Sequence, residues 1–374
     1  MKVFYIFTSL SLDKRNYERF DTKILLNFFD KIEIYCVDQG YDFTLDKIFF
    51  NKKITIHKVK TIFQITKILK IKNNSIYIDL LIPGLNSNIC KLILHLKQCK
   101  GIVYKLGNIP IYKKKIKVVS PFTTKKVLRF FSVKIYYFLN KYFFKKKKIY
   151  LCAGKKIQNE YRNLNIIKTH SFDFNENLKY KKNRINRKNF FLYLDQYEHN
   201  HPDYNFFGVN KVNAKNFYSS LNNFFDKLEK KYKKKIIIAA HPKSNNHKYF
   251  NKRKVIFDKT LELTKNCFAT ITHDSTAISY SIIYQKPIIF IVNNEMIRID
   301  KYKEKKIKVF ANELNSTLIN VDKIKNIEKF NKNFKKINKN AYNDYILKYI
   351  NNESKSEKKI GEVICDIYYR ELLN

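Results

Sequence analysis

Short apolar runs alternate with amphipathic stretches along this chain, and that alternation limits its fold more than any other feature. Runs such as 2–10, 31–40 and 53–59 are rich in Ile, Val and Tyr and end in polar residues or Gly, as strands do. Helical patterns lie between several of them, for example at 17–31 and 90–99. Strand–helix alternation of this kind predicts βαβ units and a mostly parallel sheet. Further strands of the first half are expected at 74–84, 101–107 and 115–120.

The second half repeats this organisation after a polar segment without periodicity. At 374 residues the chain is long for one core, so two α/β domains are expected. We predict Rossmann-like domains at 1–170 and 189–340, joined by a linker at 171–188. C-terminal helices are expected at 341–374, and they could pack against the first domain. The expected elements of the second domain are strands at 188–196, 234–242, 254–258, 267–275 and 286–294, and helices at 215–232 and 275–285.

The formal charge is +43, from 75 Lys and Arg against 32 Asp and Glu. Such a balance favours polyanionic partners, but the joint abundance of Lys, Asn and Ile also fits codon bias in a low-GC genome. Six cysteines without framework spacing indicate buried thiols in a reducing compartment. The first twelve residues lack the cleavage site of a signal peptide, and no run of 18 uncharged apolar residues occurs. A cytoplasmic location is therefore expected.

The stretch 236–242, IIIAAHP, ends a fully apolar strand on His241 and Pro242. Such a strand is expected to be central and buried, so His241 would emerge at its carboxyl end. Pro242 fixes φ and removes a donor, which would hold the turn and its histidine in place. In open α/β sheets ligands bind at this edge. The alternative is a histidine that only solvates the turn.

A second strand-end motif is Thr272-His273-Asp274, followed by Ser275-Thr276 at the expected start of a helix. Hydroxyls and free backbone N–H groups at a helix start favour phosphate. The alternative is that Ser275 only caps the helix, an interaction that contributes about 1 kcal/mol.

A third motif, LYLDQYEHNHPD at 192–203, places Asp195 at the end of another strand. A carboxylate there can act as a general base. Glu198, His199, His201 and Asp203 follow in the same loop and raise the alternative of a metal site, although no helical i, i+4 pair is present. A turn-capping role for Asp195 stays open as well.

In chain order the three motifs are an acid, His-Pro and Ser-Thr, and this trio resembles the bacterial sialyltransferase superfamily of GT-B fold. The resemblance implies two Rossmann-like domains facing a central cleft, with the acceptor on the first and the nucleotide-sugar donor on the second. It implies Asp195 as the base and His241 as the acid that contacts CMP, while Ser275 and Thr276 hold the phosphate. The implied donor-binding set is His241, Pro242, Lys243, His273, Ser275 and Thr276.

The resemblance covers roughly residues 190 to 295 and departs from the family at the acidic motif, where two acids and a glycine are usual and this chain has LDQY. Asp38, in VDQG, competes for the role of base. The same features also resemble the CDP-glycerol glycerophosphotransferases, which join His-Pro to a hydroxyl-rich helix start before KPIIF. Both groups must neutralise a departing cytidylate, and an imidazole, a helix start and hydroxyls could do so without a metal.

The predicted function is therefore transfer of a nonulosonic acid, sialic acid-like or Kdo-like, from a CMP donor to a surface glycan such as lipopolysaccharide, lipooligosaccharide or capsule. The alternative is a CDP-glycerol-type or other cytidine-dependent transferase. We expect no metal and no cofactor, because the CMP-sugar is a substrate. A basic nucleic-acid-binding protein is a distant alternative; no such module is recognisable, and no nucleic-acid partner is expected.

Residues 125–148 form an aromatic and basic segment. Lys134, Lys141, Lys145 and Lys148 are spaced so that they share one helical face. Such a helix could lie on the inner face of an anionic membrane, where a lipid-linked glycan would be the acceptor. The alternative is a domain-packing helix with a solvated basic edge.

Overall fold

The apolar runs of the first half pair in parallel and form one seven-stranded sheet in the computed structural model. The structure describes residues 1–37, 44–112, 124–180, 189–201, 204, 210–244, 248–324, 337–351 and 358–373. The strand order is β3-β2-β1-β4-β5-β6-β7. The strands are β1 (Val3–Thr8), β2 (Lys31–Val37), β3 (Ile54–Val59), β4 (Ile76–Leu80), β5 (Lys100–Lys105), β6 (Lys148–Ala153) and β7 (Ile166–Thr169).

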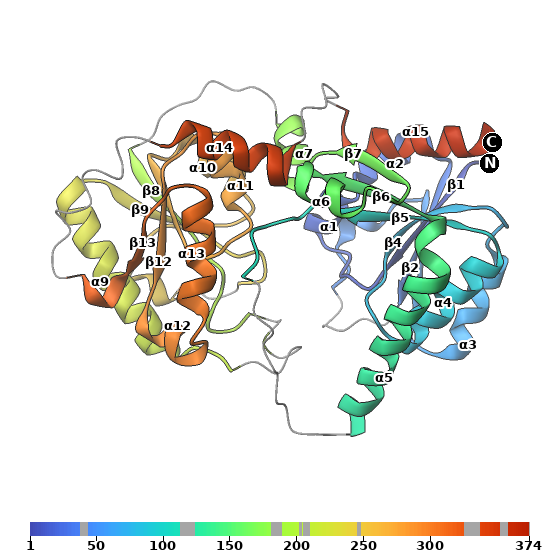
Figure 1. Cartoon of the computed structure of the whole chain (residues 1–374), viewed down its shortest axis with the longest axis horizontal. Coiled ribbons are helices and arrows are strands. Elements are labelled where there is room, and N and C mark those ends of the chain that lie inside the picture. The colour runs from blue at the N-terminus through green and yellow to red at the C-terminus, as the bar shows by residue number, and fades with distance from the viewer. Residues whose placement is uncertain are drawn as a thin grey trace. The chain divides into compact units, whose positions relative to one another are not determined.

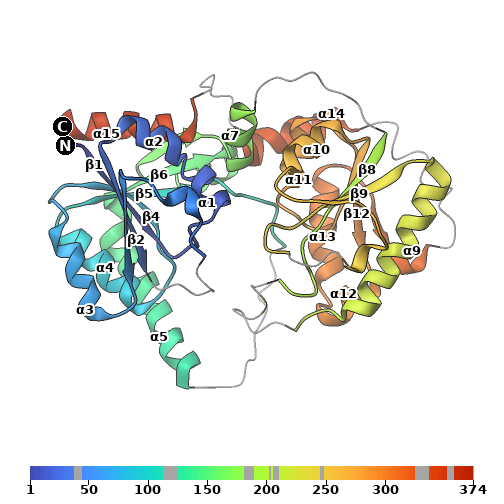
Figure 2. The same ribbon diagram turned by 180° about the vertical axis from the view of Figure 1, so that it is seen from behind.

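The second half forms a parallel sheet of six strands in the order β10-β9-β8-β11-β12-β13. Its strands are β8 (Phe190–Leu194), β9 (Lys235–Ala239), β10 (Val255–Ile256), β11 (Ala269–Thr272), β12 (Ile288–Val292) and β13 (Leu318–Asn320). Helices lie on both sides of each sheet, as parallel βαβ connections require (Figures 1 and 2). The fold class predicted from the alternating pattern is confirmed.

The chain divides into two compact units. Unit 1 comprises Met1–Leu106, Val118–Leu178 and Asn351–Asn374; unit 2 comprises Gly107–Lys117 and Lys179–Ile350. The helices of unit 1 are α1 (Lys14–Arg19), α2 (Thr22–Phe28), α3 (Ile62–Ile65), α4 (Leu85–Leu96), α5 (Thr124–Leu139), α6 (Gly154–Glu160), α7 (Phe172–Lys179) and α15 (Ile360–Leu373). Those of unit 2 are α9 (Ala214–Tyr232), α10 (Thr260–Asn266), α11 (Ile278–Ile283), α12 (Asn294–Ile299), α13 (Lys303–Glu313) and α14 (Lys339–Tyr345).

Alternation along β1 builds a core on each face of the first sheet. Phe4 and Ile6 pack in the cluster that α2 and α15 cover, whereas Tyr5 and Phe7 pack in the cluster that α3 and α4 cover. Phe7 stacks on Tyr35 of β2, with ring centroids 4.8 Å apart. Each fully buried side chain of this size contributes about 1.5–3 kcal/mol relative to an exposed one. Among the described residues, no helix combines the length and the apolar composition needed to cross a bilayer.

Three strands of the structure are absent from the sequence expectation: β6, β7 and β13. β6 follows directly on the basic helical segment, so its apolar run merges with the helical pattern. β7 and β13 are only four and three residues long, too short to show a period of two. The strand expected at 115–120 lies outside the described residues.

The helix expected at 17–31 is two helices, α1 and α2, with a break at Asp21. Asp21 has φ of 50°, in the left-handed region, which a continuous helix cannot contain. Its carboxylate is buried and accepts hydrogen bonds from the Gly361 amide (2.7 Å) and from Nδ2 of Asn175 (3.0 Å). Asn175 in turn accepts a hydrogen bond from the Ile360 amide. The break therefore fastens the start of α15 to the junction of α1 and α2 and to α7.

Gly361 tests this fastening. A Cβ at residue 361 would lie 2.7 Å from Cβ of Asp21 and 3.0 Å from Cβ of Ile24, neither of which is the end of a flexible side chain. We expect Gly361→Ala to lower the free energy of unfolding by about 1–3 kcal/mol, because overpacking outweighs the gain in helix propensity. Urea denaturation of the variant and the parent protein measures this change in the free energy of unfolding. The matched control is Gly107→Ala, which meets no atom within 4 Å; equal effects in both variants would contradict the interpretation.

Candidate active site

The three predicted motifs end at one edge of the second sheet. β8 pairs with β9 so that Leu194 lies opposite Ala239, and with β11 so that Tyr193 lies opposite Ile271. All these strands run parallel, so the residues that follow them emerge together. The register thus brings Asp195, His241 and His273 to the same edge of unit 2.

Asp195 is buried and lies beside His241. Its backbone N–H donates to the carbonyl of Ala239 (3.0 Å), and its Oδ1 accepts from the backbone N–H of Tyr197 (3.0 Å). Burial raises the pKa of Asp195 to about 6, although hydrogen bonds from the backbone N–H groups of Tyr197, His241 and Gln196 oppose the rise. Such a carboxyl can exchange a proton near neutral pH. The competing residue, Asp38, lies outside the described residues.

His241 has a defined tautomer in this arrangement. The backbone N–H of Lys243 donates to Nδ1 of His241 at 3.2 Å, so Nδ1 carries the lone pair and the ring hydrogen is on Nε2. The ring of Tyr197 lies nearly parallel to it at 6.3 Å, and the ring of His201 meets it edge-on at 4.9 Å. His241 is partly exposed, whereas Pro242 and Lys243 are exposed. The histidine therefore lies at the partly exposed edge of unit 2, with its ring hydrogen on Nε2.

His273 lies in the interior, with 1% of its surface exposed. Nδ1 contacts the carbonyl of Ile291 at 2.8 Å, and a carbonyl only accepts, so Nδ1 carries the hydrogen. Nε2 then accepts from the hydroxyl of Tyr193 at 3.0 Å. Burial lowers the pKa of His273, in agreement with a neutral ring. Both ring nitrogens of His273 are therefore hydrogen-bonded within unit 2.

Ser275 and Thr276 stand before α11 rather than within it. α11 begins at Ile278, so the helix expected from 275 starts three residues later. Ser275 Oγ accepts from the Ala277 backbone N–H at 3.3 Å, which makes a hydroxyl-closed turn. Ser275 is partly exposed and Thr276 is exposed. The hydroxyls are accessible, but the helix behind them has six residues, and its dipole adds little.

Gln196 and Asp274 link the first and third motifs. Asp274 accepts from Nε2 of Gln196 at 3.2 Å, and its own backbone N–H donates to Oε1 of Gln196 at 3.1 Å. This reciprocal pair fixes the loop after β8 against the loop after β11. Neither residue was singled out as a site residue in the sequence, because Gln196 is a polar loop residue like many others in this chain.

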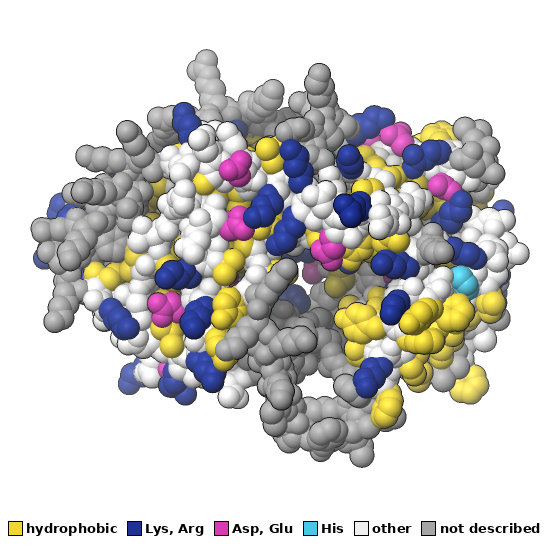
Figure 3. Space-filling model, in the orientation of Figure 1, with side chains coloured by type: hydrophobic (Ala, Val, Ile, Leu, Met, Phe, Trp, Pro, Cys, Tyr) yellow, Lys and Arg dark blue, Asp and Glu magenta, His cyan; other side chains and the backbone are white. Residues whose placement is uncertain are grey.

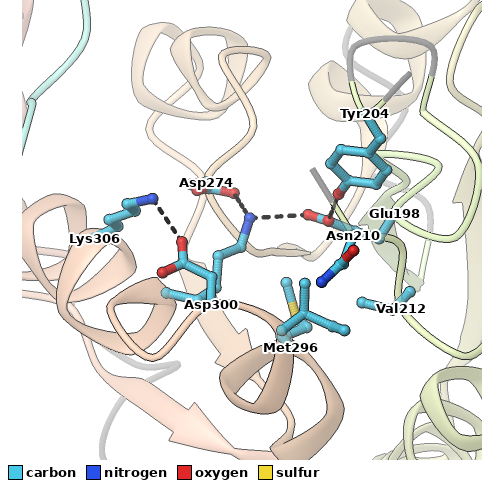
Figure 4. A pocket seen from close by; sticks show the side chains of 10 residues that line it. Glu198, Tyr204, Asn210, Val212, Asp274, Met296, Asp300 and Lys306 are labelled. Atoms are coloured by element: carbon cyan, nitrogen blue, oxygen red, sulfur yellow. Dashed lines mark hydrogen bonds and ion pairs between the residues drawn. The ribbon is translucent and has the colours of Figure 1, made fainter. Parts of the chain in front are cut away.

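Lys303, the first residue of α13, lies between two carboxylates. Its Nζ is 3.0 Å from Oε1 of Glu198 and 3.0 Å from Oδ1 of Asp274. Burial alone would lower the pKa of Lys303, but Glu198 and Asp274 raise it above its ordinary value. The hydroxyl of Tyr204 donates to Oε2 of Glu198. Figure 4 shows Glu198, Asp274 and Tyr204 around this cluster, with dashed lines for its hydrogen bonds and ion pairs.

The cluster borders a cavity of about 190 Å³. Lys306, which pairs with Asp300 at 2.6 Å, lies on the same wall, and Met296 supplies an apolar surface (Figure 4). The charged groups among these lining residues carry three negative and two positive charges. The cavity therefore has no excess of positive charge that would favour binding of an anion. Its carboxylates suit the hydroxyl groups of a ligand. The lining residues are Glu198, Tyr204, Asn210, Val212, Asp274, Met296, Ile299, Asp300, Lys303 and Lys306.

The structure uses the acids and histidines of the 192–203 loop for protein contacts. Glu198 pairs with Lys303, and Nδ1 of His199 is 2.8 Å from the hydroxyl of Tyr218. Asp203 lies outside the described residues. Within the described part of the chain, no three His, Cys, Asp or Glu side chains are grouped as a metal ion would need. Lys303 could not have been found in the sequence, because nothing distinguishes it among 75 basic residues.

No protein-family model and no curated protein sequence matches the chain. Among solved structures, the wall teichoic acid polymerase TagF is similar with a TM-score of 0.53 and 11% identity, over 100% of this chain and 89% of that one. A His-to-Asn variant of TagF after a 30-minute soak with CDPG also has a TM-score of 0.53, at 13% identity, over 100% and 90%. UDP-GlcNAc 2-epimerase from Methanocaldococcus jannaschii has a TM-score of 0.47 and 16% identity, over 99% and 100%.

Lys303→Met tests the buried charge cluster. Removing the ammonium leaves Glu198 and Asp274 uncompensated, so we expect the free energy of unfolding to fall by about 3–5 kcal/mol. The control, Lys306→Met, removes a lysine whose side chain is 34% exposed from the same cavity wall, and it should change stability by less than about 1 kcal/mol. Urea denaturation compares them. Similar losses in both variants would show that burial of Lys303 is unimportant.

Asp195 should make stability depend on pH. Its folded pKa is about 6 against an ordinary value of 3.8, so its stabilising contribution is present below pH 3.8 and is lost as pH rises through 6. Asp195→Asn removes this titration. The free energy of unfolding of Asp195→Asn, minus that of the parent protein, should rise by about 2 kcal/mol between pH 4.5 and pH 8. Denaturation curves at intermediate pH values check this, and a constant difference would contradict the raised pKa.

Proposed function

The chain has the two parallel-sheet α/β units of a GT-B glycosyltransferase-like fold, and from it we propose a transferase that uses a cytidine-activated donor. The preferred donor is of the CDP-glycerol type, and the acceptor is a hydroxyl of a glycan or lipid-linked glycan. The observation that carries the proposal is the register that places Asp195, His241 and the Ser275 turn at one edge of unit 2.

The choice of donor rests on the fold comparison. The sequence motifs predict a CMP-activated nonulosonic acid as the donor, with a CDP-glycerol-type donor as the alternative. TagF, one structure of which was soaked with CDPG, is similar over the whole length of this chain, and this supports the reverse order. Unit 2 would bind the donor, because its strand ends carry all three motifs. Unit 1 would then bind the acceptor.

In the proposed reaction an acceptor hydroxyl attacks the β-phosphorus of the donor. A bond forms between the acceptor oxygen and this phosphorus, and the bond from the phosphorus to the bridging oxygen breaks. CMP leaves with the bridging oxygen and its electron pair. Asp195, with a pKa of about 6, takes the hydroxyl proton.

His241 stabilises the leaving group in this scheme. The hydrogen on Nε2 can be donated to a CMP phosphate oxygen, and a hydrogen bond to an anionic oxygen is stronger than one to a neutral acceptor. Ser275 and Thr276 add accessible hydroxyls, and Lys243 adds an exposed cation beside His241. His273 supports the edge from behind through Tyr193.

The cavity beside Lys303 would hold hydroxyl groups rather than phosphate. At about 190 Å³ it is smaller than the roughly 300–1,000 Å³ of a site that encloses a whole drug-sized ligand. Glu198, Asp274 and Asn210 can accept hydrogen bonds from a polyol or a ribose. We infer that the phosphates lie near His241 and that a polyhydroxylated end of the donor enters the cavity.

A CMP-nonulosonate transferase is the second candidate. What favours it is the contact between Asp195 and the His241 backbone, since the sialyltransferase resemblance assigns the base and the CMP-contacting acid to these two residues. The two candidates share a cytidylate leaving group and differ in the group that is transferred.

The decisive measurement is CMP release from CDP-glycerol and, in parallel, from CMP-sialic acid. His241→Ala should lower turnover of the true donor at least about a hundredfold, because the leaving group loses its hydrogen-bond donor. The control, His95→Ala, changes a partly buried histidine of α4 and should keep full turnover. The melting temperature should be unchanged in both variants and should rise with CMP or CDP more than with UDP.

Full CMP release by His241→Ala would overturn the assignment of the acid. Turnover of CMP-sialic acid alone would select the second candidate. Stabilisation by UDP in preference to cytidine nucleotides would reject both.

A further inference from the structure

Residues 131–145, which comprise the second half of helix α5 and the π-helical segment Asn140–Phe144 that follows it, expose an unusual set of aromatic side chains. Phe131, Tyr137, Phe138, Tyr142 and Phe143 are each at least half exposed. Hydrophobic side chains and basic residues gather on this part of the surface in Figure 3, where α5 lies in Figure 1. Nothing in the proposed reaction uses them.

The inner face of the same segment is fixed to unit 1. Ser132, Tyr136, Asn140 and Phe144 follow one another at intervals of four residues. The Ser132 carbonyl accepts from Nδ2 of Asn88 (3.0 Å), and the Tyr136 hydroxyl donates to the carbonyl of Leu81 (3.3 Å). Phe144 is buried. The segment therefore cannot turn its aromatic face inward without breaking these contacts.

Two buried lysines strengthen this attachment. Lys91 and Lys148 both approach Oδ2 of Asp79, at 3.1 and 3.0 Å, and none of the three side chains is more than 7% exposed. Lys91 also donates to the Tyr136 hydroxyl at 2.9 Å, and Lys148 donates to Oδ1 of Asn140 at 2.7 Å. The anchoring polar groups lie behind the helix, so its outer face is presented in one orientation.

The outer face carries an apolar stripe with lysines beside it. Phe131, Ile135, Phe138 and Tyr142 are spaced by four, three and four residues, the spacing of one helical face. They are 57%, 49%, 56% and 62% exposed. Three further residues on this segment, Lys134, Lys141 and Lys145, are exposed, and no Asp or Glu occurs from 124 to 148.

We propose that this face, defined by Phe131, Ile135, Phe138 and Tyr142 with Lys134 and Lys141, docks on the surface of an anionic lipid bilayer. Apolar and aromatic side chains gain by entering the headgroup boundary, and lysines at the edge gain from anionic lipid. An aliphatic Ile135 at the centre of the stripe favours a lipid phase over a nucleic acid, whose bases would stack on aromatic rings only. The inference is independent of the donor.

Co-sedimentation with vesicles tests the proposal. The full chain should bind vesicles of phosphatidylcholine and phosphatidylglycerol, in roughly a 7:3 ratio, at least about tenfold better than phosphatidylcholine alone. Ile135→Gln with Phe138→Gln should lower the partition coefficient at least about tenfold. Lys134→Gln with Lys141→Gln should remove the preference for anionic vesicles. Circular dichroism and thermal melting should match the parent protein.

The controls remove equal numbers of similar exposed groups from the α15 side of the first sheet. Phe50→Gln with Tyr369→Gln matches the apolar pair, and Lys14→Gln with Lys52→Gln matches the lysine pair. Both should bind like the parent chain. Three results would overturn the proposal: equal loss in the controls, binding to RNA but not to vesicles, and self-association through the stripe without vesicle binding.

Discussion

The parallel register of β9, β8 and β11 is the constraint on which the candidate site depends. The register is fixed because a slip of one residue would exchange the side chains that pack on the two faces of β8, all five of which are buried, and would disrupt the packing on both sides of the sheet. Asp195, His241 and His273 therefore emerge at the same level. The loops after the strands need only short links, such as the Gln196–Asp274 pair, to become one site.

Two clusters among the described residues pair buried or largely buried lysines with carboxylates. Asp79 compensates Lys91 and Lys148 beneath α5, and Glu198 with Asp274 compensates Lys303 beside the cavity. A buried charge without a partner would be strongly destabilising, so an acidic residue is required beside each of these lysines.

The departures from the sequence expectations have identifiable physical causes. One helix became two because Asp21 adopts a left-handed conformation to reach Gly361, a partner 340 residues away. The hydroxyl-rich segment 275–277 forms a turn before α11, because Ser275 Oγ takes up the Ala277 amide in a local hydrogen bond. His273 is buried and its two ring nitrogens contact Ile291 and Tyr193, while its predicted part in donor binding stays a prediction. Local pattern contains no information about such distant or competing partners.

By itself the sequence determined the α/β class, the two-part organisation and the strand ends at which Asp195, His241 and Ser275 stand. The alternation of short apolar runs with amphipathic helical stretches carries this information, because a parallel sheet needs apolar strands and helices that cover both of its faces. The tertiary structure alone decided which lysine became Lys303 of the cavity, which tautomer His241 adopts and which face of α5 is exposed. Those properties depend on contacts between residues far apart in the chain, and the residue types at these positions are too common in it to reveal them.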